Sequence, residues 1–505
     1  MTDPRRVAHP APDGVRHATA LPRRPRAVVV GAGIAGLTAA VGLAERGIAV
    51  DIVEREGYAG GRVGGWTDRL DDGTPVAMNR GFHAFFRQYY NLRKLLRRID
   101  PKLSMLSPVL DYPLVDGHGR RDTFRGLPQS PPLNALAFAM RSPTFRLRDL
   151  VRLNARAAAP LAAVSVPQTY RDLDHVDADT FLRDINFPEA ARHLAFEVFS
   201  RSFFCRPQDL SAAELATMFH IYFLGSSEGL TFDVANANFD VALWRPLCEY
   251  LRSLGVGIHL GAAVTRVRAG ERFAVSCADG TEIGADAVVL ATDVRGLRSI
   301  VANSPGLGDD AWRAQVSSIR TAPAFAVHRL WLDRPVARDR APFLGTGGMP
   351  PCDNVSVLDR YEREAAEWAR ATGGSVVELH SYSLTEPHHD VRDELLARLH
   401  QLYPETREAN IVGEIVLYRD DCPRFAPNDF ATRPQVSTPV NRLALAGDGI
   451  RIDLPVALME RAATTGWSAA NLLLNRFGIA GHDLHTVPTR GRFTPLRRLA
   501  ERQRA

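Results

Sequence analysis

Hydrophobic positions near the start of the chain follow a strand, turn, helix, strand order. An apolar β-branched run over 28–30 predicts a buried strand, 37–46 has the composition of a helix, and a second strand over 47–53 ends at Glu54. The uncharged stretch 27–44 is also about long enough to cross a bilayer. Because that stretch contains several glycines and charged residues follow it directly, the pattern favours strand and turn.

Three glycines occupy the turn between the first strand and the helix. Gly31 allows a tight turn, Gly33 lets the backbone approach a pyrophosphate, and Gly36 lets the helix pack closely on the strand. The helix N-terminus then faces the phosphates, and an acid at position 54 suits an unphosphorylated ribose. The sequence therefore predicts a dinucleotide-binding turn formed by Gly31, Ala32, Gly33, Ile34, Ala35 and Gly36, with Glu54 on the ribose.

Two glycine pairs follow in the segment 54–67. This segment resembles the diglycine signature of the large flavoprotein group that contains amine oxidases and carotenoid desaturases. The resemblance implies that Gly60 and Gly61 run close to the diphosphate of FAD, that Arg62 supports the same region, and that Arg55 belongs to the cofactor site. On their own the glycines also fit a flexible loop, but here they follow a dinucleotide fingerprint.

Two segments near the C-terminus are similar to another part of that family's cofactor site. Residues 443–449 predict a buried strand that ends in a short acidic turn, and 455–473 predicts a helix. By resemblance, Gly447 and Asp448 meet the ribityl or phosphate region, and the backbone around Leu458 and Met459 lies near the flavin pyrimidine ring. The positive end of the helix would stabilise negative charge on the reduced flavin.

The cofactor segments lie at the start, middle and end of the chain, so the predicted FAD domain is discontinuous. In the middle, Val264 lies in a strand similar to the one that meets adenine, and 286–292 is similar to the strand that closes the domain. We expect an α/β fold with a glutathione-reductase-like, Rossmann-type FAD domain and a second domain that combines helices with a mixed sheet, including 322–332 and 375–380. The expected boundaries are 26–95, 235–300 and 435–480 for the FAD domain, 96–234 and 301–434 for the substrate and membrane-facing domain, and 1–25 and 482–505 for two basic tails, the first of them disordered.

Composition limits the remaining choices. A net charge of +5 over 505 residues is weak, and the chain shows no nucleic-acid-binding module. Residues 1–25 lack the apolar segment of a signal peptide. Five widely spaced cysteines without metal-ligand spacing fit a reducing, cytoplasmic compartment and predict no metal site. Cys422 precedes the last FAD strand, where some amine oxidases attach flavin covalently, although an ordinary thiol also fits.

A long segment, 78–92, contains Gly81, Phe82 and His83 among many aromatic residues. It resembles the hallmark of carotenoid desaturase-type enzymes that make aromatic end rings, and 454–462 is similar to the same enzymes, as are 196–210 and 218–230. The resemblance implies a carotenoid phi-ring synthase, which is a β-carotene desaturase/methyltransferase, and it places Gly81 and Phe82 beside FAD. The related chi-ring synthases leave a different methyl pattern from a similar scaffold.

The implied chemistry converts the β-rings of β-carotene to the trimethylphenyl rings of isorenieratene. Aromatising one ring removes four hydrogens and moves a methyl group from C1 to C2, through hydride loss to FAD and a carbocation. Aromatic faces would stabilise the cation, and a base must remove protons. The candidate bases are His83, Glu228 and Asp233. A lone histidine is also commonly a hydrogen-bonded structural residue, and an aromatic cluster is commonly core.

A carotenoid is too apolar to diffuse through water, so the enzyme should dock on a membrane. Residues 133–148 mix large apolar groups with arginines, as an interfacial helix would, although a buried helix with charged edges fits equally. We expect a peripheral protein at the inner face of the cell membrane, with a quinone or oxygen as the electron acceptor.

Three other functions are compatible with a chain that carries this dinucleotide fingerprint. A desaturase of an acyclic carotene would use the same FAD site. An amine oxidase commonly places a lysine near the flavin, but the chain has only Lys94 and Lys102, both early. A non-enzymatic lipid carrier with this fold would bind no flavin, whereas an intact fingerprint with Glu54 predicts a yellow protein.

Overall fold

A five-stranded parallel sheet draws its strands from three distant segments of the chain. The computed structural model describes residues 3–145, 151–192, 201–384 and 391–491, with 494, 497 and 498. The sheet order is β11-β3-β2-β15-β21, and every pairing is parallel. The strands are β2 (Arg26–Val30), β3 (Ala49–Glu54), β11 (Gly257–Leu260), β15 (Ala287–Leu290) and β21 (Leu443–Leu445). The turns after β2, β3, β15 and β21 therefore meet at one edge.

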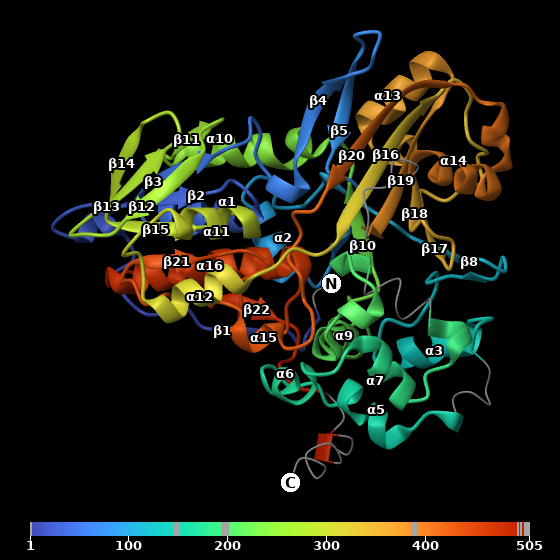
Figure 1. Ribbon diagram of the computed structural model, residues 1–505, viewed down its shortest axis with the longest axis horizontal. Coiled ribbons are helices and arrows are strands. Elements are labelled where there is room, and N and C mark those ends of the chain that lie inside the picture. Colours follow the sequence, from blue (N-terminus) through green and yellow to red (C-terminus); the bar gives the residue numbers. More distant parts are fainter. Residues whose placement is uncertain are drawn as a thin grey trace.

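Two helices pack against each other beside this sheet (Figure 1). All residues of α1 (Ile34–Ala44) are buried, and α16 spans Leu458–Arg476. A Cβ on Gly42 would lie 2.7 Å from the Cβ of Ala470, so the two backbones are close. The uncharged stretch 27–44 is thus a strand, a turn and a helix buried on all sides, which explains its resemblance to a membrane span.

A three-stranded antiparallel sheet and several helices complete this half of the molecule (Figure 1, left). Its strands β12, β13 and β14 are followed by β15 and by helices α11 and α12, whose apolar residues join the same core. The bounds are β12 (Val264–Arg268), β13 (Phe273–Cys277), β14 (Glu282–Ala285), α10 (Arg245–Ser253), α11 (Val294–Ala302) and α12 (Asp310–Ser318). Because α12 packs here, this half extends past the expected boundary at 300.

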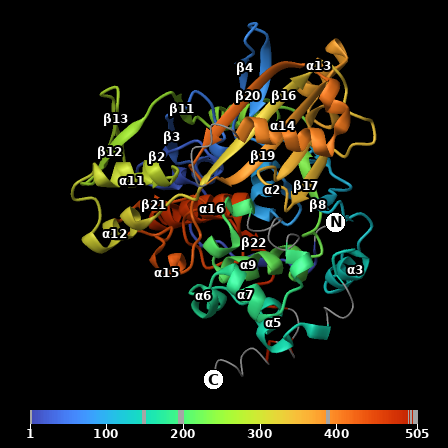
Figure 2. The same cartoon turned by 45° about the vertical axis from the view of Figure 1, so that its right-hand side comes forward.

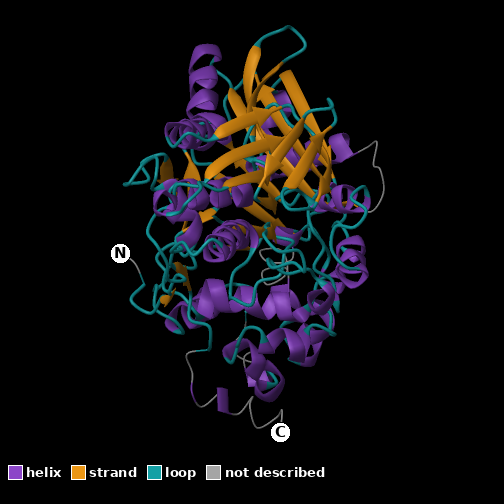
Figure 3. Cartoon of the chain, turned by 90° about the vertical axis from the view of Figure 1, so that its left-hand side faces the viewer, coloured by secondary structure: helices purple, strands orange, loops and turns teal. Residues whose placement is uncertain are grey.

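A seven-stranded mixed sheet forms the second half, as expected (Figures 1 and 3). Its order is β20-β16-β19-β18-β17-β8-β9, antiparallel except for the β17–β8 pair. Helices α13 (Arg363–Thr372) and α14 (Val391–Leu402) lie beside it (Figure 2). The strands are β8 (Leu114–Asp116), β9 (Arg121–Asp122), β16 (Ala324–Leu332), β17 (Phe343–Gly347), β18 (Asn354–Val357), β19 (Ser375–Leu384) and β20 (Ile411–Arg419), which confirms the predicted strands 322–332 and 375–380.

The hairpin of β4 (Gly65–Arg69) and β5 (Pro75–Asn79) crosses between the two halves. Leu70, Val76 and Met78 share a core with Phe325 and Trp331 of the mixed sheet. The segment 26–95 thus does not belong wholly to the cofactor half. Further helices and strands in the described part of the chain are β6 (Phe85–Phe86), α2 (Tyr90–Leu96), β7 (Leu106–Pro108), α3 (Leu133–Arg141), α5 (Ala155–Ala162), α6 (Gln168–Leu173), α7 (Ala178–Asp184), α9 (Ala212–Phe219), β10 (Phe232–Ala235) and α15 (Asp429–Thr432).

Both predicted tails are wrong in the part that the structure describes. Strand β1 (Val7–His9) pairs antiparallel with β22 (Leu484–Thr486), and Ala18 is buried. His482 is also buried, and the Gly491 amide donates to the Val164 carbonyl. Strand pairing between residues almost 500 positions apart gives these polar segments backbone partners, which local composition cannot reveal.

A buried ion cluster joins the helical region to the cofactor half. Glu214 of α9 accepts hydrogen bonds from Arg461 at 2.7 Å, Tyr170 at 2.9 Å and Arg433 at 3.2 Å. Burial alone would raise the pKa of Glu214, but the two guanidinium charges hold it below its ordinary value. The carboxylate therefore stays ionised and holds α9 against α16.

Replacing Glu214 by Ala should destabilise the fold by about 3–5 kcal/mol, because two buried guanidinium groups lose their partner. Urea denaturation followed by circular dichroism measures this free energy. Glu282→Ala is the control, because its pair with Arg268 is long, at 3.5 Å, and exposed. That change should cost less than about 1 kcal/mol, and equal losses in the two variants would contradict the assigned role of the cluster.

Candidate functional site

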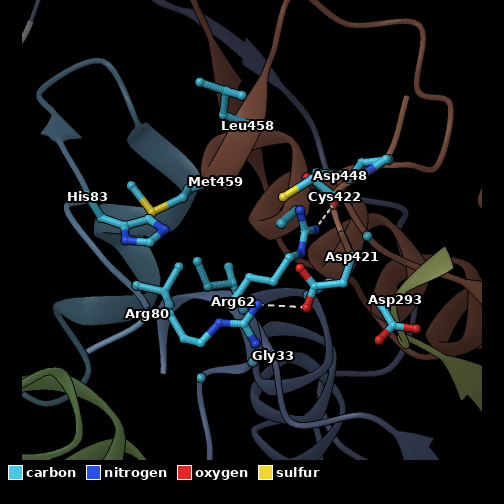
Figure 4. Close-up of a pocket in the computed structure, with 18 of the residues that line it drawn as sticks. Gly33, Arg62, Arg80, His83, Asp293, Asp421, Cys422, Asp448, Leu458 and Met459 are labelled. Carbon is cyan, nitrogen blue, oxygen red and sulfur yellow. Dashed lines mark hydrogen bonds and ion pairs between the residues drawn. The ribbon is translucent and has the colours of Figure 1, made fainter. Parts of the chain in front are cut away.

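One cavity of about 690 Å³ begins at the carboxyl edge of the parallel sheet and reaches the mixed sheet. Its wall contains the glycine turn after β2, the end of β3, the loops after β15 and β21, and the start of α16. The opposite wall comes from the aromatic segment around β6, from β10, and from β17 and β19. Figure 4 shows ten of the lining residues with labels.

Backbone rather than side chain lines the cavity at its glycine turn. Gly31 has φ +104°, and a Cβ there would lie 2.6 Å from the Ala291 carbonyl oxygen, so the turn needs glycine. At Gly33 a Cβ would meet only the Cα of Gly61, at 4.0 Å. Gly33 is the N-cap of α1 and no side chain caps the helix. The bare N-terminus and the two facing glycines form a cradle that fits a pyrophosphate.

The adjoining loop is fixed by backbone contacts to this turn. Gly60, in the left-handed region with φ +100°, donates its amide to the Ala32 carbonyl at 2.8 Å. A Cβ on Gly60 would lie 2.2 Å from the Trp244 indole nitrogen. Gly36 is equally constrained, since its Cβ would clash with the Gly31 carbonyl oxygen at 1.9 Å. Gly31, Gly36 and Gly60 thus stand where no other residue fits.

Glu54 lies at the cavity wall with its carboxylate held by backbone amides. One oxygen accepts from the Ala32 amide at 2.7 Å and the other from the Glu56 amide at 2.9 Å. Burial raises the pKa of Glu54, against these two hydrogen bonds. Arg55 pairs with Asp293 at 2.7 Å, and Val264 lines the same end of the cavity. This end offers a carboxylate and a nonpolar surface, which fit a ribose and a purine ring.

Four charged side chains meet beside the cradle. Arg62 donates to Asp448 in a short ion pair, and Arg80 pairs with Asp421 at 2.7 Å (Figure 4). Partial burial alone would raise the pKa of Asp421, but the positive charges of Arg80 and Arg62 keep it below its ordinary value. Arg80 and Asp421 lie outside the predicted set, because no local motif marks either residue.

The N-terminus of α16 also opens onto the cavity. Ala457 is its N-cap without a side-chain hydrogen bond, and Leu458 has φ +52°, which is a strained conformation for a residue other than glycine. Leu458 and Met459 both line the cavity, while Gly447 is held by Thr465 through its amide. The helix predicted over 455–473 thus begins at Leu458 in the structure, and the amides of its first turn face the cavity.

Aromatic side chains form the other half of the cavity. Phe82 packs on Phe343 with ring centroids 4.3 Å apart, and Phe86 and Tyr112 pack on Phe232 at 5.3 and 4.8 Å. Each of these rings lines the cavity. Such a surface suits a hydrocarbon and can stabilise a cation through ring faces.

Of the three candidate bases, only His83 lines the cavity. Its Nδ1 lies 2.9 Å from the Gly81 carbonyl oxygen, so Nδ1 carries the proton in the neutral ring and Nε2 is the basic atom. Burial lowers the pKa of His83 to about 4, which keeps it neutral at pH 7.

Glu228 and Asp233, the other two candidate bases, are each held by another side chain. Glu228 accepts hydrogen bonds from the Tyr90 hydroxyl and the Asp3 amide, both at 3.0 Å. Asp233 is held in a short ion pair with Arg93. Neither is among the described residues that line the cavity. Both carboxylates thus tie strands and loops together, a role that sequence alone cannot separate from catalysis.

Cys422 and the lysines have distinct positions. Cys422 lines the cavity near Arg62, and burial raises the pKa of its thiol to about 12. Lys94 donates to the Asp483 carbonyl oxygen at 2.7 Å, and Lys102 is exposed. No lysine is among the described residues that line the cavity, which argues against the amine oxidase alternative.

Neither a membrane-spanning helix nor a metal-binding cluster occurs among the described residues. Within those ranges, no helix has both the length and the apolar composition that a membrane span requires. Over the same described parts of the chain, no group of three histidine, cysteine or acidic side chains is placed to hold a metal ion.

Comparison with known proteins agrees with the geometry. The family model for flavin-containing amine oxidoreductases matches residues 34–474. A carotenoid phi-ring synthase of Streptomyces griseus is 55% identical, over 97% of this chain and 95% of that protein. A carotenoid phi-ring synthase of Chlorobaculum tepidum is 27% identical, over 93% and 91%.

Solved structures share the fold. An engineered putrescine oxidase superposes with a TM-score of 0.66 at 17% identity, over 90% of this chain and 99% of that one. Cyclohexylamine oxidase from Brevibacterium oxydans gives 0.65 at 15%, over 90% and 100%. The expected α/β fold and the resemblance to carotenoid enzymes are confirmed, and the family implies a flavin. The chain therefore belongs to the flavin-containing amine oxidoreductase family and, within it, to the carotenoid phi-ring synthases.

Proposed function

We propose that this protein binds FAD and converts the β-rings of β-carotene to phi-rings. The observation that carries the proposal is one continuous cavity that joins a dinucleotide cradle to an aromatic chamber. Similarity along almost the whole chain to phi-ring synthases supports the ring outcome. The alternative function is a desaturase that acts on acyclic carotenes, and the products would distinguish it from a phi-ring synthase.

The cradle residues would hold FAD along its length. Glu54 would accept from the adenosine ribose, with Val264 against adenine and Arg55 near that end. The pyrophosphate would lie on the turn 31–36, on Gly60 and Gly61, with Arg62 beside it. Gly447, Asp448 and Met459 would face the ribityl chain and the flavin ring, with Gly81 and Phe82 opposite. When bound, FAD supplies the capacity to accept hydride.

The chain's own residues would orient the ring and remove its protons. Four hydrogens leave each ring as two hydrides and two protons, so a proton acceptor must work twice or two acceptors must share the task. The faces of Phe82, Phe86 and Phe232 would exclude water and stabilise positive charge on the ring. His83 would accept a proton at Nε2, since its Nδ1–H is committed to Gly81.

Expression in a bacterial host that accumulates β-carotene tests the function. The expected pigment is lighter than β-carotene by the four hydrogens of each converted ring, and NMR of its methyl groups should show the phi pattern. A chi pattern would correct the ring outcome. Unchanged β-carotene beside yellow, FAD-loaded protein would contradict ring aromatisation and favour an acyclic substrate, tested next in lycopene and phytoene hosts.

Gly33→Ala should weaken FAD binding by at least about tenfold, because the added methyl occupies the path of the pyrophosphate. Its melting temperature without FAD should stay close to that of the unmodified protein, since the new Cβ meets nothing nearer than 4.0 Å. Fluorescence titration with FAD measures the affinity. Gly57→Ala, where a Cβ has no neighbour within 4 Å, is the control. Equal affinity of the two variants would contradict the cradle.

We also propose that helix α3 docks the protein on a membrane. Leu133, Leu136 and Met140 lie on one face of α3 and are 56%, 49% and 65% exposed. On the opposite face, Phe138 stacks on Phe124 at 4.8 Å. Phe124 in turn stacks at 4.3 Å on Tyr112, which lines the cavity. The last three residues of the predicted interfacial segment 133–148 lie outside the described residues.

This position suits a carotenoid that moves from a bilayer to the cavity past a row of aromatic rings. A protein held there by one helix would be peripheral. A membrane quinone would then be within reach as the electron acceptor, with oxygen as the other candidate.

Replacing Leu136 and Met140 together by Glu should reduce sedimentation with vesicles of anionic phospholipid at least about tenfold, because two charges would enter the apolar boundary. The chain offers a control in Val412 of β20, which is 51% exposed and lies on an edge strand of the seven-stranded mixed sheet. Val412→Glu should sediment like the unmodified protein. If the α3 variant also sediments normally, another surface docks the membrane.

A further inference from the structure

A row of polar side chains runs from the cavity into the interior of the mixed sheet. Tyr382 lines the cavity, and its hydroxyl lies 2.8 Å from Nδ1 of His380. The other ring nitrogen of His380, Nε2, lies 2.8 Å from Glu378. The second oxygen of Glu378 accepts two hydrogen bonds from Arg329, at 2.9 and 2.7 Å. Four side chains are thus linked in series.

The sheet itself places these groups in line. Glu378, His380 and Tyr382 alternate along β19, so their side chains point to one face. Arg329 of β16 lies directly opposite Glu378 in the register. Asn354 of β18 lies opposite His380, and its amide donates to the Tyr382 hydroxyl at 3.1 Å. Two neighbouring strands therefore hold both ends of the row.

The hydrogen-bond pattern fixes where each proton sits. Burial alone would raise the pKa of Glu378, but Arg329 and His380 lower it to about 2, so the carboxylate only accepts. Nε2 of His380 lies 2.8 Å from this carboxylate and 3.3 Å from the Phe82 amide nitrogen. The shorter contact, to a group that only accepts, assigns the hydrogen to Nε2 and leaves Nδ1 of the neutral ring to accept. The Tyr382 hydroxyl receives the Asn354 amide and directs its own hydrogen at Nδ1. The row is arranged to pass a proton inward from the cavity.

This arrangement has an energetic cost that a hydrocarbon site does not explain. Arg329, Glu378 and His380 are each at most 2% exposed. Buried polar groups of this kind stabilise a fold little compared with apolar packing. β-Carotene has no hydrogen-bonding group, so the Tyr382 hydroxyl has no polar partner on the substrate. A role in proton removal accounts for a polar chain that ends at this cavity.

We propose that Tyr382, backed by His380 and Glu378, accepts one of the two protons that leave the carotenoid ring. The proposal rests on the proposed function, and it assigns the other proton to His83. The imidazoles of His83 and His380 both lie close to Gly81. Nδ1 of His83 bonds the Gly81 carbonyl, and a Cβ on Gly81 would lie 2.8 Å from Cε1 of His380.

The proton step balances within these residues. After hydride loss, a ring carbon next to the cationic centre gives its C–H electron pair to the new double bond. The released proton goes to the Tyr382 oxygen while the hydroxyl hydrogen passes to Nδ1 of His380. The ring loses its charge, and His380 becomes an imidazolium ion that Glu378 stabilises. Tyr382 leaves the step as a neutral phenol.

Tyr382→Phe tests the relay, with Tyr250→Phe as the control. Tyr250 of α10 is not among the described residues that line the cavity, and its hydroxyl donates to Glu45 at 2.8 Å. FAD-loaded protein is mixed with β-carotene in phospholipid vesicles, and pigments are quantified in H₂O and D₂O. The aromatic product should form at least about tenfold more slowly in Tyr382→Phe. The slowing in D₂O that unmodified protein and Tyr250→Phe show should disappear in the Tyr382→Phe variant.

Flavin content, the flavin absorption bands and the melting temperature separate the outcomes. All three should be unchanged in Tyr382→Phe if the hydroxyl acts on the substrate proton. Lost flavin or shifted bands would overturn the proposal, because Tyr382 would then be a cofactor contact. A normal rate with a normal D₂O effect would also overturn it. If unmodified protein makes no aromatic rings, the proposed function itself fails, and the relay with it.

Discussion

The site depends on the parallel pairing of β15 between β2 and β21. Hydrogen bonds along β15 bring Gly31, Thr292 and Gly447 to one edge, although they are separated by more than 400 positions of sequence. Parallel strands need long crossover connections. Those connections carry the second sheet and the helical region in this chain. The same edge that exposes backbone amides to a dinucleotide therefore also positions the aromatic chamber against it.

The cavity combines two environments that place opposite demands on the protein. Its cradle is lined by bare backbone and by the ion pairs Arg62–Asp448 and Arg80–Asp421, which fit a charged cofactor. Its other half is lined by phenylalanine and tyrosine rings, which fit a substrate without polar groups. Polar atoms in that second half are costly unless they are paired. His83 and Tyr382 are paired there, and each still presents an atom that can take part in proton transfer.

The glycine positions were predictable because their roles are local. Gly31 and Gly60 adopt positive φ, and Gly36 contacts the preceding turn, so residue type and spacing suffice to identify them. Asp421 and Tyr382 carried no such signal, since each matters only through a partner on another element. The partners of Glu228 and Asp233, which are Tyr90 and Arg93, are also remote in sequence, so the pattern gave no sign that both carboxylates make contacts between elements.

The sequence by itself determined the cofactor class, the strand and helix order around the turn, and the family. Those properties reside in short runs whose backbone geometry follows from residue type and spacing. Tertiary structure decided which polar groups reach the cavity, where the two halves divide, and that residues 7–9 pair with 484–486 instead of forming a tail. Side-chain proximity across sheets depends on register and packing between distant segments, and a linear pattern does not contain that information.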